Sequence, residues 1–82
     1  MDEILYLKKI KSVEWVVFND FFNSKIPKDI LEFLSKYQRV KFGYNFNQPV
    51  DNLPPKLKEI NFGLGFCKPL DNLPNGLKKN NI

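Results

Sequence analysis

The chain has 82 residues, so it can form one small domain, which buries roughly 60% of its unfolded surface. Its composition, 43% hydrophobic and 15% aromatic, is too apolar for a disordered chain. The sequence has a single cysteine, Cys67, which excludes an internal disulfide and a cysteine metal cage, and it has no histidine, which removes most hydrolase and metalloenzyme mechanisms. We therefore expect one folded domain that is not an enzyme and has no cofactor or metal.

The charge balance, 13 Lys and Arg against 9 Asp and Glu, gives a net charge of +4. Arg39 is the only arginine, and the lysines are scattered along the chain, which favours a solvated surface over a specific nucleic-acid site. No run approaches the roughly 18 apolar residues that cross a bilayer, and the first residues lack the pattern of a signal peptide. We expect an intracellular, cytoplasmic protein that binds neither a membrane nor a specific nucleic acid.

The N-terminal segment, residues 1–12, places apolar residues among charges. The spacing of Ile4, Leu7 and Ile10 predicts a short helix, with a strand as the alternative. In either form we expect this segment to be an N-terminal cap, because the open end of a repeat stack exposes its core.

Two elements follow it. Residues 13–18 are rich in β-branched and aromatic side chains and predict a strand. After Pro27, apolar residues recur at intervals of three and four over residues 28–36, which predicts a short helix.

A short repeat organises the remaining chain. Residues 57–75 align with residues 37–55 at an offset of 20, and residues 13–26 align with the latter at an offset of 24. Such a period indicates a stack of similar units within one domain. The predicted units are a divergent repeat 1 over residues 13–36, repeat 2 over 37–56, repeat 3 over 57–76 and a truncated repeat 4 over 77–82.

One strand per repeat predicts a repeat solenoid with a short parallel β-sheet, because each circuit returns beside the one before. Equivalent apolar residues should then stack in four columns, each running through three repeats: Val16, Val40, Ile60; Phe18, Phe42, Phe62; Phe22, Phe46, Phe66; Ile26, Val50, Leu70. Gly43 and Gly63 follow the core Phe, where we expect glycine to allow a positive φ at a sharp turn. The proline-rich returning segments predict an irregular convex side with Asx-type bonds at residues 51–52 and 71–72.

The segment FGYNFNQPVDNLP at residues 42–54 resembles the FNIP repeat, a relative of the leucine-rich repeat abundant in social amoebae and in giant viruses that infect amoebae. Residues 62–74 keep the frame but carry Cys67 and Lys68 where Asn and Gln are usual. The resemblance implies a leucine-rich-repeat-like solenoid that presents a protein-interaction surface, in the host cytoplasm if the protein is viral.

Family members are sometimes attached to an F-box that recruits a ubiquitin ligase, and residues 26–34 are similar to the opening of an F-box. An F-box needs about three helices, whereas the repeat resumes by Tyr37. The alternatives to an interaction module are therefore a substrate-adaptor fragment of this kind, or a degenerate repeat paralogue without its own partner.

The candidate binding surface consists of side chains that alternate with the core along each strand. By the alignment, one outward ladder is Trp15, Arg39, Glu59, Lys79, and the next is Val17, Lys41, Asn61, Asn81. Arg39 and Glu59 should form a lateral ion pair. An outward Trp15 would be a typical interface anchor, and the alternative is that the N-terminal segment covers it.

We expect an unidentified protein partner on this concave face, and end-to-end self-association through the sheet edges is a further possibility. The repeated Asp51 and Asp71 do not suggest catalysis, because turn positions explain them and no nucleophile accompanies them.

Overall fold

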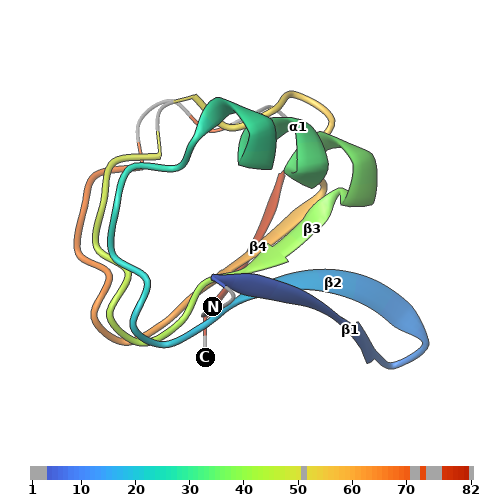
Figure 1. The fold of residues 1–82 in the computed structure, drawn as a ribbon, viewed down its shortest axis with the longest axis horizontal. Helices are drawn as coiled ribbons and strands as arrows, with labels where there is room; N and C mark the ends of the chain where they lie inside the picture. Colours follow the sequence, from blue (N-terminus) through green and yellow to red (C-terminus); the bar gives the residue numbers. More distant parts are fainter. Residues whose placement is uncertain (1–3, 51, 71–72, 74–76, 82) are drawn as a thin grey trace.

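The computed structural model describes residues 4–50, 52–70, 73 and 77–81. Along the chain they form β1 (Leu5–Ile10), β2 (Val13–Phe18), α1 (Lys28–Tyr37), β3 (Arg39–Lys41), β4 (Glu59–Phe62) and β5 (Lys78–Asn81) (Figure 1). The strands build one five-stranded sheet in the order β1-β2-β3-β4-β5. The loops that leave β2, β3 and β4 follow nearly the same path, and α1 lies across the interior from the sheet (Figure 1).

The N-terminal segment is a strand, so the helix that its spacing predicts is wrong and the alternative is confirmed. β1 runs antiparallel to β2 from Leu5↔Phe18 to Ile10↔Val13. Lys11 and Ser12 join the two strands with φ of 53° and 68°, the left-handed values that two-residue hairpin turns require. The segment forms a strand despite its helical spacing because every residue of β1 pairs with a residue of β2.

β2, β3, β4 and β5 are parallel neighbours, and the first three have the register that the repeat predicts. Val16 pairs with Val40, and Val40 pairs with Ile60. The fourth strand differs by one residue, because Ile60 faces Lys79 instead of Asn80. Hydrophobic alternation normally sets register, and the sequence of β5, KKNN, contains no apolar residue to set it.

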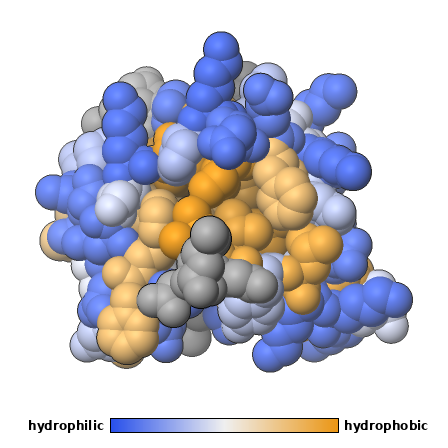
Figure 2. All heavy atoms as spheres, viewed as in Figure 1, coloured by the Kyte–Doolittle hydropathy of each residue, from blue (hydrophilic) through white to orange (hydrophobic). Residues whose placement is uncertain are grey.

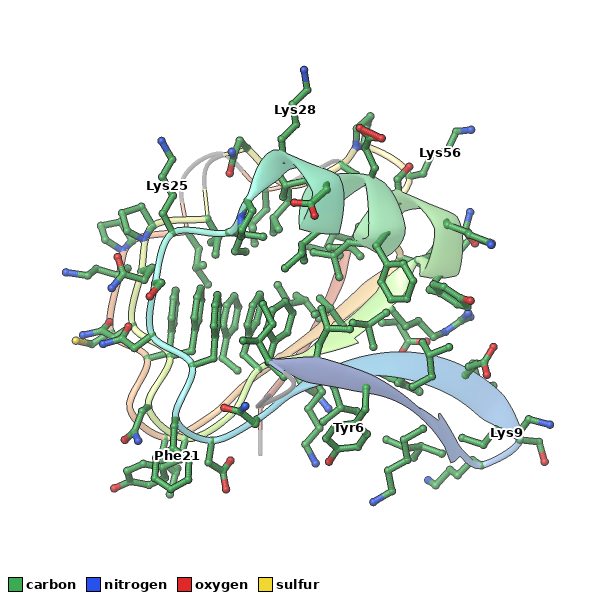
Figure 3. All side chains as sticks on the ribbon, viewed as in Figure 1. Tyr6, Lys9, Phe21, Lys25, Lys28 and Lys56 are labelled. Atoms are coloured by element: carbon green, nitrogen blue, oxygen red, sulfur yellow. The ribbon has the colours of Figure 1, made fainter. Side chains whose placement is uncertain are left out.

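The predicted apolar columns form the core. Val16, Val40 and Ile60 are each 0% exposed. The ring of Phe42 stacks between Phe18 and Phe62, with centroids 4.9 and 5.8 Å away. Phe46 stacks in the same way between Phe22 and Phe66, at 5.9 and 6.1 Å (Figure 3). The column that ends in Leu70 is buried at Ile26 and Val50 and half-buried at its last member. We call the part of the core that each repeat contributes a layer, numbered from the first repeat to the third. Exposure thus rises toward the third layer, where Phe66 is also half-buried.

Helix α1 spans Lys28–Tyr37, one residue beyond the prediction. Pro27 is its N-cap in an extended conformation, and Asp29 lies in the first turn, where a negative charge complements the helix dipole. The helix ends at Gln38, whose φ of 67° is left-handed, and the Gln38 carbonyl accepts hydrogen bonds from the N–H groups of Lys58 and Glu59. The helix end is therefore tied to the start of β4. It is the one helix among the described residues, fewer than an F-box contains.

The glycines that follow the core Phe are required for a different reason from the predicted one. Neither Gly43 nor Gly63 has a φ between +20° and +160°, the range that favours glycine. Instead, a Cβ atom at Gly43 would lie 2.5 Å from the carbonyl oxygen of Asn19, and one at Gly63 would lie 2.5 Å from the carbonyl oxygen of Gly43. Successive layers approach so closely here that only a hydrogen atom fits.

The end of the stack formed by the first layer presents apolar atoms at its centre, surrounded by hydrophilic residues (Figure 2). A cavity of about 320 Å³ at this end is lined by Ile4, Leu5, Asp29, Ile30 and Phe33. The predicted turns at residues 51 and 71–72 lie outside the described residues.

Candidate functional site

The face of the sheet that points away from the core carries two rows of neighbouring side chains. Val16 and Phe18 belong to the core, so the alternating Trp15 and Val17 point to the opposite side. The strand register extends this alternation across β1, β3 and β4. One row consists of Lys8, Trp15, Arg39 and Glu59, and the other of Tyr6, Val17, Lys41 and Asn61. These eight residues are the outer sheet face, and they include all six candidates that the sequence singled out.

Trp15 is buried, with 7% of its surface exposed, so it is not the exposed anchor that one of the two expectations requires. Val17 is also 7% exposed. Strand β1 explains this burial, because it places Lys8 beside Trp15 and Tyr6 beside Val17. Long side chains such as lysine can cover an apolar neighbour with their aliphatic stems. The expectation that the N-terminal segment covers Trp15 stays a prediction, and the register places Lys8 of that segment beside Trp15 in the sheet.

Arg39 and Glu59 form the predicted ion pair. The Arg39 Nε atom donates to Glu59 Oε1 at 3.0 Å, and each side chain is 26% exposed. A pair this exposed contributes about 0.2–1 kcal/mol to stability. Its larger effect is on the charge of the outer sheet face, because it neutralises the one acidic side chain there.

Lys41 and Asn61 are half-buried neighbours in the second row. Lys41 makes no ion pair within the described part of the chain. The Asn61 Oδ1 atom is buried and accepts no hydrogen bond from a described residue. A buried acceptor without a partner costs about 1–3 kcal/mol.

A groove of about 580 Å³ lies beside this row, where the strands end and the loops begin. Its lining includes Phe18, Phe42 and the glycines Gly43 and Gly63. Its walls carry Tyr6, Val17 and Lys41 on the strand side and Phe21, Tyr44 and Leu64 on the loop side. We call it the strand-end groove.

Four large side chains of the groove are exposed: Tyr6 is 46%, Phe21 86%, Tyr44 56% and Leu64 75% accessible. Tyr6 and Phe21 both point away from the stacked core rings on the same side of the molecule (Figure 3). Scattered exposed apolar residues are ordinary, but a contiguous group at one groove indicates a contact surface.

Hydrogen bonds within the first loop and between successive loops hold the loop wall in place. The Asn19 Oδ1 atom accepts the N–H groups of Phe21 and Phe22, both at 3.0 Å. The Asp20 Oδ1 atom accepts the Tyr44 N–H at 3.1 Å, and the Tyr44 carbonyl accepts the Gly65 N–H at 3.1 Å. The backbone under the exposed side chains is thus fixed, and those side chains project from ordered positions.

A ladder of side chains on the next turn of the loops has a structural role. The Asn23 Oδ1 atom accepts the Asn47 N–H at 2.9 Å, and the Asn47 Oδ1 atom accepts the Cys67 N–H at 3.0 Å. Cys67, exposed and with a free thiol, has no amide oxygen with which to continue the ladder. No group of three or more potential metal ligands occurs among the described residues.

Sequence reasoning missed Tyr6, Phe21, Tyr44 and Leu64. Tyr44 and Leu64 lie 20 residues apart at equivalent positions, directly after the repeat glycine. Turns normally carry small or polar residues at such positions. Two large apolar residues at the same turn of successive repeats were therefore the available signal.

Comparison with known proteins gives one match. Residues 38–65 match the family model described as FNIP Repeat. No curated protein and no solved structure matches the chain significantly. Within the described residues, no helix is long and apolar enough to cross a membrane. The matched segment runs from the C-cap of α1 through β3 and β4 to the loop wall of the groove, so this part of the chain contains an FNIP repeat.

Proposed function

We propose that this chain is a short leucine-rich-repeat-like solenoid and a non-catalytic protein-interaction module that binds its partner through the outer sheet face, the concave face of such a repeat. The observation that carries the proposal is the outer sheet face itself, with the exposed apolar residues of the strand-end groove beside it. Protein interfaces combine apolar anchors with a polar surround, and this surface offers both.

The arrangement of polar groups supports binding rather than catalysis. Arg39 and Glu59 bond to each other, which satisfies their charges without a substrate. Lys41 lies between apolar Val17 and Asn61, without a nucleophile or base beside it in the register. A catalytic site requires such a partner within hydrogen-bond reach.

The test is affinity capture with charge-reversed variants. Lys41→Glu changes the outer sheet face, and the matched control Lys28→Glu makes the same change on α1, where Lys28 points to the opposite side of the molecule (Figure 3). We expect specific proteins that are captured by the wild type and by Lys28→Glu, and lost with Lys41→Glu. Equal capture by all three forms would refute the assignment of the face.

Self-association is a second candidate, supported by the apolar surface at the first-layer end of the stack (Figure 2). Ile4 at this end is 37% exposed, so Ile4→Asp adds a charge there without emptying the core. Sedimentation equilibrium should show dimers or longer assemblies that Ile4→Asp dissociates. A wild-type monomer at all concentrations would reject this candidate.

A further inference from the structure

We propose that the strand-end groove binds an extended acidic peptide segment of another protein, with two apolar side chains separated by acidic residues. This inference rests on the proposed function and adds the site and the chemistry of the partner to it. The groove, its apolar wall and its charge each contribute a part of the argument.

The direction of the groove matches an extended chain. Tyr44 and Leu64 belong to successive layers, and Phe21 lies beside them on the first layer, so the loop wall runs along the stacking direction. Three layers about 4.8 Å apart span roughly 10 Å. An extended segment rises about 3.3 Å per residue and turns alternate side chains to one side, so two of its apolar side chains cover most of this wall.

The apolar wall is ready to bind without a large ordering cost. Phe21 and Leu64 are 86% and 75% exposed, yet the Phe21 N–H donates to Asn19 Oδ1 within its own loop, and Gly65, the residue after Leu64, donates its N–H to the Tyr44 carbonyl of the preceding loop. Preorganised apolar surface contributes to affinity because little chain entropy is lost on binding. This favours a partner that brings its own apolar side chains.

Over the groove and the outer sheet face together, Lys8, Arg39 and Lys41 outnumber the carboxylates of Glu59 and Asp20 by one, which favours an acidic partner. Lys41 lines the groove, and Lys8 lies on the neighbouring row of the outer sheet face. The acidic Glu59 is already paired with Arg39. Asp20 is the one acidic residue of the lining, and its Oδ1 atom accepts the hydrogen bond from the Tyr44 N–H. Cationic groups beside an apolar wall complement a segment that mixes apolar and acidic residues.

A single-stranded nucleic acid also combines stacking with cation contacts. The peptide is favoured because the one arginine, Arg39, is engaged with Glu59, and the groove itself contains a single lysine. Electrostatic tracking of a phosphate backbone requires several cations along the path.

The experiment selects heptapeptides from a random phage library on the immobilised full chain and measures the affinity of synthetic versions by fluorescence anisotropy. The double variant Phe21→Ser/Leu64→Ser removes the apolar wall, Lys41→Glu reverses the groove charge, and Lys28→Glu is the matched control. Phe21 and Leu64 are so exposed that their loss should leave the circular dichroism spectrum unchanged.

We expect selected peptides with alternating apolar and acidic residues. The double variant and Lys41→Glu should each weaken binding about tenfold or more, as loss of an interface hot spot does, while Lys28→Glu should bind normally. The proposal is overturned if no peptide is enriched, if the double variant binds them as the wild type does, or if a thymidine oligonucleotide binds more tightly.

Affinity capture separates this failure from failure of the proposed function. Partners that are lost with Lys41→Glu but kept by Phe21→Ser/Leu64→Ser would support the outer sheet face as the binding surface and would reject the groove as the peptide site. Partners that neither variant affects would refute both proposals.

Discussion

The rings of Phe42 and Phe46 lie against each other within the middle layer, with centroids 4.0 Å apart and planes 11° apart. Each ring also stacks on its equivalents in the layers before and after, and both residues are 0% exposed. The middle layer therefore joins the two outer layers through these two side chains.

Replacing Phe46 by Ala should cost about 3–5 kcal/mol, because the neighbouring rings cannot close the cavity. A chain of 82 residues has a total stability of roughly 4–12 kcal/mol, so this one change should remove at least about a quarter of the stability, and all of it at the lower end of that range. Phe66→Ala in the half-buried third layer should cost less. Urea denaturation followed by circular dichroism measures both, and equal losses would contradict the layered packing.

Gly63→Ala should destabilise the protein by more than about 2 kcal/mol, because its Cβ atom would collide with the Gly43 carbonyl oxygen 2.5 Å away. The neighbouring exposed Leu64 is a suitable control, since Leu64→Ala should change stability by less than about 0.5 kcal/mol. Thermal melts of the two variants compare the effects. If Gly63→Ala left the melting temperature unchanged, the layers would be able to move apart to accept the Cβ atom.

Several of these relationships follow from the sequence, because a repeat fixes them. An offset of 20 residues is enough to place Arg39 beside Glu59 and Phe42 beside Phe62. The ion pair at 3.0 Å and the stacked rings agree with that alignment.

The remaining features depend on local contacts that a period does not encode. The register of β5 has no apolar residue to set it, so the alignment of Lys79 with Glu59 was wrong. The burial of Trp15 depends on β1, which lies outside the repeat. Glycine is required at positions 43 and 63 because the layers lie close together, not because of a special backbone angle. The exposed side chains of the groove wall lie at turn positions where the residue type differs between repeats.

The Arg39–Glu59 pair should have a coupling energy of about 0.2–1 kcal/mol in a double-mutant cycle of Arg39→Ala and Glu59→Ala. Salt should reduce this coupling, since both side chains are 26% exposed. The cycle is measured by urea denaturation at low and high sodium chloride. Coupling that is absent at low salt would show that the pair contributes nothing to stability.

Asn61→Val should stabilise the protein by about 1 kcal/mol, because it removes the buried Oδ1 acceptor and places a β-branched residue in strand β4. The midpoint of thermal unfolding measures this change. Asn61→Asp is the comparison, and it should destabilise the fold because it buries a charge in place of the amide. A loss of stability in Asn61→Val would show that the Asn61 amide makes a hydrogen bond that stabilises the fold.

The most direct test of the proposed binding site is to map where a selected acidic heptapeptide binds, by NMR chemical-shift changes in the isotope-labelled chain. Binding in the strand-end groove predicts the largest amide shifts at Phe21, Lys41, Tyr44 and Leu64, with little change along α1. Shifts concentrated on α1, or spread evenly over the exposed lysines, would contradict it.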